Sequence, residues 1–139
     1  KPYSSSMPQY VYAAPAVMLA LRWPMDELDQ RIAQRTRLMF DQGLIEETRE
    51  LDRLGLRHTK TAAKATGYAQ ALAVIDGDMT IPEAIDSVAL ATRQLARRQV
   101  KWLRRDPRIM WIDRSGEGTA TSTEAALQTA RQVVLSALQ

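Results

Sequence analysis

The feature that most constrains the fold of this chain is one long helix with a start signal and a stop signal at its ends. Thr80-Ile81-Pro82-Glu83 has the pattern of a capping box, in which the threonine caps the first turn and the glutamate returns the hydrogen bond. Pro107 ends the helix, because proline has no N–H group to donate and clashes with the preceding turn. These signals predict a helix over Ile81–Arg105. The composition also favours helices over a sheet-rich sandwich, since aromatic residues make up only 6% of the chain and glycine occurs six times.

Shorter elements follow from the same kind of signal. Gly43 and Gly55 close two helices of a hairpin, and two apolar runs are short enough for buried strands. The expected helices are Pro24–Gln42, Leu44–Leu54, Tyr68–Ile75 and one from Thr121 or Ser122 to Leu138, and the expected strands are Val17–Leu21 and Ile109–Ile112. The predicted fold class is α/β, predominantly helical, with few short strands. We expect a linker and strand at 1–24, a helical core portion at 25–113, and a loop with a C-terminal helix at 114–139.

The composition excludes several functional classes. Without cysteine the sequence has no disulfide framework and no thiolate zinc site, and no apolar run reaches the roughly 18 residues of a membrane span. The formal net charge of +3 is unevenly distributed. Between Arg93 and Arg108 there are seven basic residues and one acid, Asp106, whereas the rest of the chain is net negative. Such a segment is typical of a surface that binds a polyanion.

The basic segment falls on one side of the long predicted helix. At about 100° per residue, four cations lie near one line and three apolar residues lie on the opposite side, which we interpret as facing the core. The cations are Arg93, Arg97, Lys101 and Arg104, and the apolar residues are Val88, Leu95 and Trp102. Either the cations form a solvated face paired with acids elsewhere, or they bind phosphate. The lack of acids at helical spacing in this stretch favours phosphate.

A second anomaly lies in the helix predicted after Pro24. Its apolar stripe consists of Leu28, Ile32 and Met39. Arg35 projects from the middle of that stripe, with Arg31 on its flank, and an arginine directed into a core requires an anion. That anion is either an internal carboxylate, such as Glu46 or Glu47, or the phosphate or diphosphate of a ligand held by the guanidinium fork.

Several motifs, taken in order, resemble the C-terminal half of the bacterial tRNA dimethylallyltransferases, the IPP transferase family. They are Leu28-x-x-Arg31-Ile32-x-x-Arg35-x-x-x-Met39-x-x-x-Gly43-Leu44-Ile45-x-Glu47, then Thr61-Ala62-x-Lys64-Ala65-x-Gly67-Tyr68-x-Gln70, then Ala91-Thr92-Arg93-Gln94-Leu95-Ala96-Arg97-Arg98-Gln99-x-x-Trp102-Leu103-Arg104, and Trp111-Ile112. The resemblance runs from about Lys1 to Ile112. Because several independent motifs agree in order and spacing, it is specific.

The resemblance implies the C-terminal portion of a nucleotide-binding, P-loop NTPase-like fold. It implies an enzyme that moves a dimethylallyl group from its diphosphate to the exocyclic amine of the adenosine 3′ to the anticodon of tRNA, in the cytoplasm and with Mg²⁺. Arg35, with Arg31 nearby, would then meet the diphosphate. The residues implied to bind tRNA, including the basic face, are Lys64, Ala65, Thr66, Gly67, Tyr68, Ala69, Arg93, Arg97, Arg98, Gln99, Lys101, Trp102 and Arg104.

The chain also departs from the family. The family's phosphate loop and its catalytic aspartate belong to the N-terminal half, so we expect this chain alone to be inactive, to lack the Mg²⁺ ligands and to need that half as a partner. Lys64 stands where arginine is more usual, which keeps the charge without the fork, and Thr66 replaces a branched apolar residue. Strand edges left uncovered make dimerisation a further hypothesis.

Two other functions stay open from the sequence. One is a non-catalytic helical module that binds nucleic acid through the basic face, and the other is an interaction domain whose basic face meets an acidic protein. Arg35 separates the enzyme from the binding module, because a binding module has no reason to place an arginine among apolar residues. His58 lies in a polar turn, and we interpret it as a surface residue and not a catalytic base.

Overall fold

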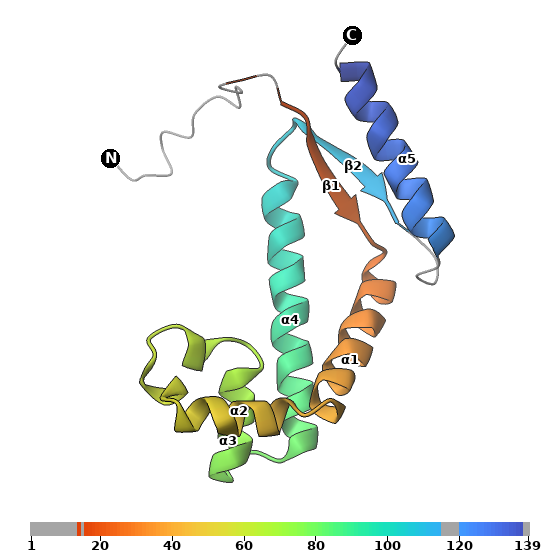
Figure 1. Ribbon diagram of the computed structural model, residues 1–139. Coiled ribbons are helices and arrows are strands. Elements are labelled where there is room, and N and C mark those ends of the chain that lie inside the picture. Colours follow the sequence, from red (N-terminus) through yellow and green to blue (C-terminus); the bar gives the residue numbers. More distant parts are fainter. Residues whose placement is uncertain (1–13, 15, 115–119, 138–139) are drawn as a thin grey trace. The chain divides into compact units, whose positions relative to one another are not determined.

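The computed structural model describes residues 14, 16–114 and 120–137, and it is predominantly helical with a two-stranded sheet (Figure 1). In chain order the elements are β1 (Met18–Arg22), α1 (Met25–Asp41), α2 (Leu44–Arg53), η2 (Leu56–His58), η3 (Ala62–Lys64), α3 (Tyr68–Asp76), α4 (Ile81–Leu103), β2 (Ile109–Asp113) and α5 (Ala120–Ala137). The predicted fold class and the two expected strands are confirmed. None of the described helices is long and apolar enough to cross a membrane.

Local signals determine where most helices begin and end. Thr80 and Glu83 form the expected capping box, in which the backbone N–H of Thr80 donates to Glu83 Oε2 at 2.8 Å. Gly43 and Gly55 both adopt positive φ, at 100° and 99°, and separate α1, α2 and η2. Helix α5 begins at Ala120, before the two residues proposed as its cap.

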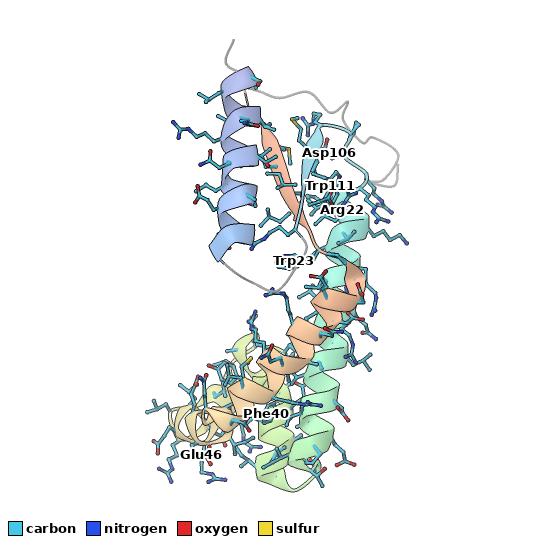
Figure 2. The ribbon with its side chains drawn as sticks, turned by 90° about the vertical axis from the view of Figure 1, so that its right-hand side faces the viewer. Arg22, Trp23, Phe40, Glu46, Asp106 and Trp111 are labelled. Atoms are coloured by element: carbon cyan, nitrogen blue, oxygen red, sulfur yellow. The ribbon has the colours of Figure 1, made fainter. Side chains whose placement is uncertain are left out.

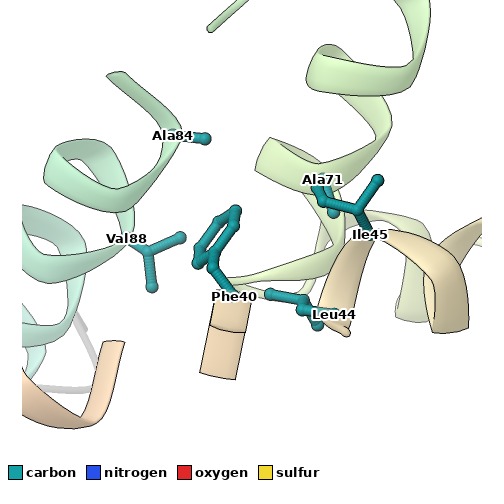
Figure 3. Packing of buried hydrophobic residues seen from close by; sticks show 6 residues of the cluster. All are labelled: Phe40, Leu44, Ile45, Ala71, Ala84 and Val88. Carbon is teal, nitrogen blue, oxygen red and sulfur yellow. The ribbon is translucent and has the colours of Figure 1, made fainter. Parts of the chain in front are cut away.

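The described residues form two compact units, Leu28–Arg98 and those within Lys1–Glu27 and Gln99–Gln139. The unit 28–98 has one hydrophobic core, shown in Figure 3. Its buried members are Phe40, Leu44, Ile45, Ala71, Ala84 and Val88, which come from α1, α2, α3 and α4. On α1 the buried line passes through Ile32, Thr36 and Phe40, one turn apart.

The second unit contains the sheet. Strands β1 and β2 are parallel, and their register places Met18 opposite Ile109 and Arg22 opposite Asp113. At the ends of the strands the Arg22 guanidinium donates from Nη2 to Asp113 Oδ2 at 2.8 Å, which holds the pKa of that carboxyl below its usual range. The same guanidinium lies 5.8 Å from the centre of the Trp111 ring (Figure 2). Helix α5 contacts β2.

The expected core face of α4 is wrong beyond its first half. Val88 is buried, but Leu95 is 46% exposed and Trp102 is 66% exposed. The buried residues of α4, Ala84, Val88 and Ala89, all lie in its first half. The two large side chains therefore lie beyond the described core, although the helical period continues through them. Trp111, which lies in the expected buried strand Ile109–Ile112, is half-buried.

Candidate functional site

Six of the residues expected to meet tRNA, Lys64 to Ala69, extend from the end of η3 to the first turn of α3. Lys64 ends η3, Ala65 is extended, and Gly67 adopts φ 106° and ψ −64° before α3 begins. The side chains of Lys64, Ala65 and Thr66 are exposed, whereas Gly67 is buried. We call residues 64–66 the exposed crest and Gly67, directly after it, the base of the crest.

Side-chain hydrogen bonds hold the base of this crest. The Gly67 N–H donates to Gln70 Oε1 at 2.9 Å, and Gln70 Nε2 in turn donates to Ser87 Oγ of α4 at 3.3 Å. The Tyr68 hydroxyl donates to Glu47 Oε1 at 2.6 Å, and this bond to a carboxylate raises the pKa of Tyr68. The first turn of α3, directly after the crest, is therefore hydrogen-bonded to both α2 and α4.

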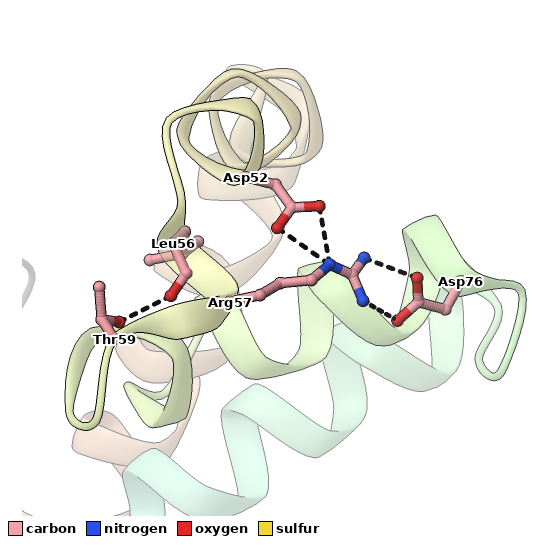
Figure 4. A network of polar contacts seen from close by, with 5 residues as sticks. All are labelled: Asp52, Leu56, Arg57, Thr59 and Asp76. Atoms are coloured by element: carbon pink, nitrogen blue, oxygen red, sulfur yellow. Dashed lines mark hydrogen bonds and ion pairs between the residues drawn. The ribbon is translucent and has the colours of Figure 1, made fainter.

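Arg57 fixes the segment that leads to the crest, and the sequence reasoning missed it (Figure 4). Its Nε donates to both oxygens of Asp52, at 2.9 and 2.8 Å, while Nη1 and Nη2 donate to the two oxygens of Asp76 at 2.8 and 2.6 Å. These bonds raise the pKa of Arg57, and its guanidinium lowers the pKa of Asp76. Arg57 and Asp76 are 19 residues apart, so no helical spacing signals the contact.

The expected position of Arg35 inside an apolar stripe is wrong. Arg35 is exposed, and Arg31 is half-buried. The buried line of α1 runs through Ile32, Thr36 and Phe40, so Arg35 lies about 100° away from its centre. Among the described residues Arg35 forms no ion pair with Glu46 or Glu47.

Met39, one turn after Arg35 on α1, lies against Gly67. A Cβ atom added to Gly67 would lie 3.9 Å from Met39 Cε and 3.9 Å from Leu44 Cδ2, so the Met39 side chain reaches the crest's base. Arg35 precedes Met39 by one turn on the same side of α1, and residues at that spacing are neighbours on a helix surface. The contact shown with Gly67 is therefore that of Met39, and Arg35 lies one turn before it on α1.

The basic face of α4 is largely exposed. Arg97, Lys101 and Arg104 are exposed and Arg93 is half-buried; of the other residues expected to bind tRNA here, Arg98, Gln99 and Trp102 are exposed. Within the part of the chain that the structure describes, Arg97 alone of the four cations pairs with an acid, through Nη2 and Asp29 Oδ2 at 2.7 Å. The alternative that acids elsewhere in the chain pair with the basic face is therefore met, among the described residues, by Arg97 alone of these four cations.

The described residues contain no group of three His, Cys, Asp or Glu side chains that could hold a metal ion. Magnesium prefers carboxylates and phosphate oxygens in an octahedral arrangement. The described residues therefore do not fit a magnesium site of their own.

Comparison with known proteins decides the family. The family model described as IPP transferase matches residues 1–106. The chain belongs to the IPP transferase family. The tRNA dimethylallyltransferase of Pseudarthrobacter chlorophenolicus is 51% identical over 113 residues, which cover 81% of this chain and 38% of that protein. The tRNA dimethylallyltransferase of Nocardia farcinica is 41% identical over 130 residues, covering 91% of this chain and 41% of that protein.

Solved structures of IPP transferases agree with the fold. The full-length tRNA isopentenylpyrophosphate transferase of Bacillus halodurans matches 82% of this chain and 38% of its own, with a TM-score of 0.69 and 31% identity. The corresponding transferase of Staphylococcus epidermidis matches 84% of this chain and 37% of its own, with a TM-score of 0.70 at 22% identity, which supports the fold alone.

These matches confirm the resemblance inferred from the motifs. The chain spans about two fifths of the length of the curated relatives that it matches.

Proposed function

We propose that this chain is part of a tRNA dimethylallyltransferase, which joins a dimethylallyl group to the exocyclic amine of the adenosine 3′ to the anticodon. The observation that carries the proposal is the 51% identity to a tRNA dimethylallyltransferase over 81% of the chain. In this reaction the bond between the allylic carbon and the diphosphate oxygen breaks, a carbon–nitrogen bond forms, and the amine loses a proton. We place the enzyme in the cytoplasm, where tRNA is modified.

In this proposal Arg35, with Arg31 one turn earlier, receives the diphosphate. The leaving group gains charge as the carbon–oxygen bond breaks, and a guanidinium fork stabilises that charge with paired hydrogen bonds. The exposure of Arg35 supports this role, because its donors are accessible to a ligand. The sequence has no Gly-x-x-x-x-Gly-Lys-Ser/Thr loop. We therefore assign the base, the phosphate loop and the Mg²⁺ ligands to the portion of the relatives that this chain does not match.

The crest and the basic face of α4 bind the tRNA in this proposal. Exposed cations gain affinity for a nucleic acid by releasing the counterions condensed on its phosphates. Three of the four cations on the face have no acid partner among the described residues. The crest adds Lys64 and small side chains that permit close approach to a nucleotide.

Replacement of Arg97, Lys101 and Arg104 by alanine in the complete protein tests the tRNA face. Affinity for tRNA should fall, and the slope of log affinity against log salt should decrease by about one unit for each phosphate that the variant no longer neutralises. Arg49→Ala is the matched control, because Arg49 is an exposed arginine on α2 outside the proposed face. An unchanged affinity and slope in the triple variant would refute the assignment of this face.

Arg35→Ala tests the diphosphate site separately. The variant should raise the KM for dimethylallyl diphosphate and lower kcat, while tRNA affinity stays near that of the parent. Arg35→Lys keeps the charge but not the fork, so it should recover only part of the activity.

One observation favours the second candidate, a non-catalytic nucleic-acid-binding module. Because Arg35 is exposed and not directed into the core, it could also serve as one more phosphate contact. Under that interpretation Arg35→Ala lowers tRNA affinity and the salt slope together, and prenyl diphosphate does not bind.

A further inference from the structure

An ion pair links α1 to the basic face of α4 within the unit 28–98. Arg97 Nη2 lies 2.7 Å from Asp29 Oδ2. Phe40 of α1 and Val88 of α4 belong to the same buried cluster. Asp29 precedes Phe40 on α1, whereas Arg97 follows Val88 on α4. Because Asp29 pairs with Arg97 and Phe40 shares a cluster with Val88, the two helices run antiparallel. The core lies near one end of the pair and the ion pair near the other.

The two partners differ in how freely they can move. Asp29 is the more enclosed partner, since its side chain is 30% exposed and its Oδ1 atom is buried, so its carboxylate has less room to move than the Arg97 guanidinium. Arg97 is 52% exposed and uses one N–H group of Nη2 on Asp29. A guanidinium has further donors in a rigid fork, so the remainder of the Arg97 fork is available at the surface while one side of it is fixed.

We propose that Asp29 is a positioning residue, which orients Arg97 so that the free side of its fork meets a phosphate of the bound RNA. This inference rests on the proposed function of the α4 face. Ordering a long side chain at an interface has an entropic cost. Because the ion pair with Asp29 orders the Arg97 side chain before the RNA binds, less of this cost falls on the binding step. Arg93, Lys101 and Arg104 have no such acid partner among the described residues.

The two possible roles of Asp29, positioning Arg97 or acting only as a negative charge, predict opposite changes in tRNA affinity for Asp29→Ala. If Asp29 acts only as a negative charge beside a phosphate-binding face, its removal strengthens tRNA binding. If it positions Arg97, Asp29→Ala weakens binding by about two- to tenfold, the range expected when one long side chain must be ordered on binding. Asp29→Asn keeps an oxygen that can accept the hydrogen bond, so it should retain parental affinity or bind slightly more tightly.

The experiment measures tRNA affinity and its salt slope for the complete protein with and without Arg97→Ala. We expect Asp29→Ala to weaken binding when Arg97 is present and to leave it unchanged or stronger when Arg97 is replaced. Asp41→Ala is the matched control, because Asp41 is an exposed acid on the same helix with no ion pair among the described residues. It should not weaken binding in either background.

Three outcomes overturn the proposal, and they are distinguishable. If Asp29→Ala strengthens binding equally in both backgrounds, Asp29 acts as a charge alone and the tRNA face stands. If Arg97→Ala itself changes neither affinity nor slope, this part of the proposed tRNA face falls together with the inference. If Asp29→Ala unfolds the protein, Asp29→Asn decides, and a loss of affinity in a folded Asp29→Asn variant that is independent of Arg97 counts against positioning.

Discussion

Gly67→Ala, at the base of the exposed crest, tests whether a side chain there is disfavoured by the backbone conformation or by a steric clash. Gly67 has φ 106° and ψ −64°, a combination outside the left-handed helical well that asparagine tolerates. A Cβ atom there would meet Met39 and Leu44 at 3.9 Å, which is ordinary contact distance. The penalty therefore comes from the backbone and not from a clash.

The size of the penalty follows from these angles. A non-glycine residue held in a sparsely populated region costs about 1–3 kcal/mol. The substitution also stiffens the unfolded chain, which offsets about 0.4–1 kcal/mol. We expect Gly67→Ala to lower the free energy of unfolding by about 1–2 kcal/mol, measured by urea denaturation of the complete protein.

Gly77 provides the matched control. It has φ 82° and ψ 8°, within the left-handed well, and a Cβ atom there would meet nothing within 4 Å. Gly77→Asn should therefore be nearly neutral, whereas Gly67→Asn should be as destabilising as Gly67→Ala. If Gly67→Ala is neutral, or if Gly67→Asn restores stability, the strain argument is refuted.

Two further predictions concern the same unit. Phe40→Ala should destabilise the protein by about 3–5 kcal/mol, because Phe40 is buried among α1, α2 and α4 side chains; Leu54→Ala, at a side chain that is 84% exposed, should change urea stability by less than about 0.5 kcal/mol. Arg57→Gln should lower the free energy of unfolding most at neutral pH. The lowered pKa of Asp76 means that its pairing with Arg57 stabilises the folded state above the unfolded pKa of about 3.9 and is lost as the pH falls through the folded value. The stability deficit of Arg57→Gln should shrink between about pH 5 and pH 2, and a constant deficit would contradict the linkage.

Local signals account for the parts of the fold that the sequence predicted. The capping box at Thr80 and the glycine at position 43 act on their own turn of backbone, so they are readable without knowledge of distant residues. The strand Ile109–Asp113 is predictable because a short apolar run after a proline leaves little room for a helix. In each case the cause lies within a few residues of its effect.

The errors come from contacts between distant segments. The stripe predicted for α1 omits Thr36, whose polar side chain gives no hydrophobic signal, and Phe40, yet these residues are 3% and 7% exposed and lie on the buried line. That omission rotates the predicted face and directs Arg35 inward. Leu95 is predicted to lie in the core because the helical period continues through it, but periodicity cannot say where the partner elements stop.

The wide separation of the two strands has a consequence for folding during synthesis. Arg22 and Asp113, which close the ends of β1 and β2, are 91 residues apart in the chain. At about 5–20 residues per second, a ribosome needs roughly 5–20 s to make the interval between them. Throughout that time β1 has no β2 with which to pair, and an unpaired strand edge with apolar side chains such as Leu19 and Leu21 is prone to aggregate. The helical unit between the strands has mostly local contacts and can fold within this interval, so the pairing of β1 with β2 should form after that unit.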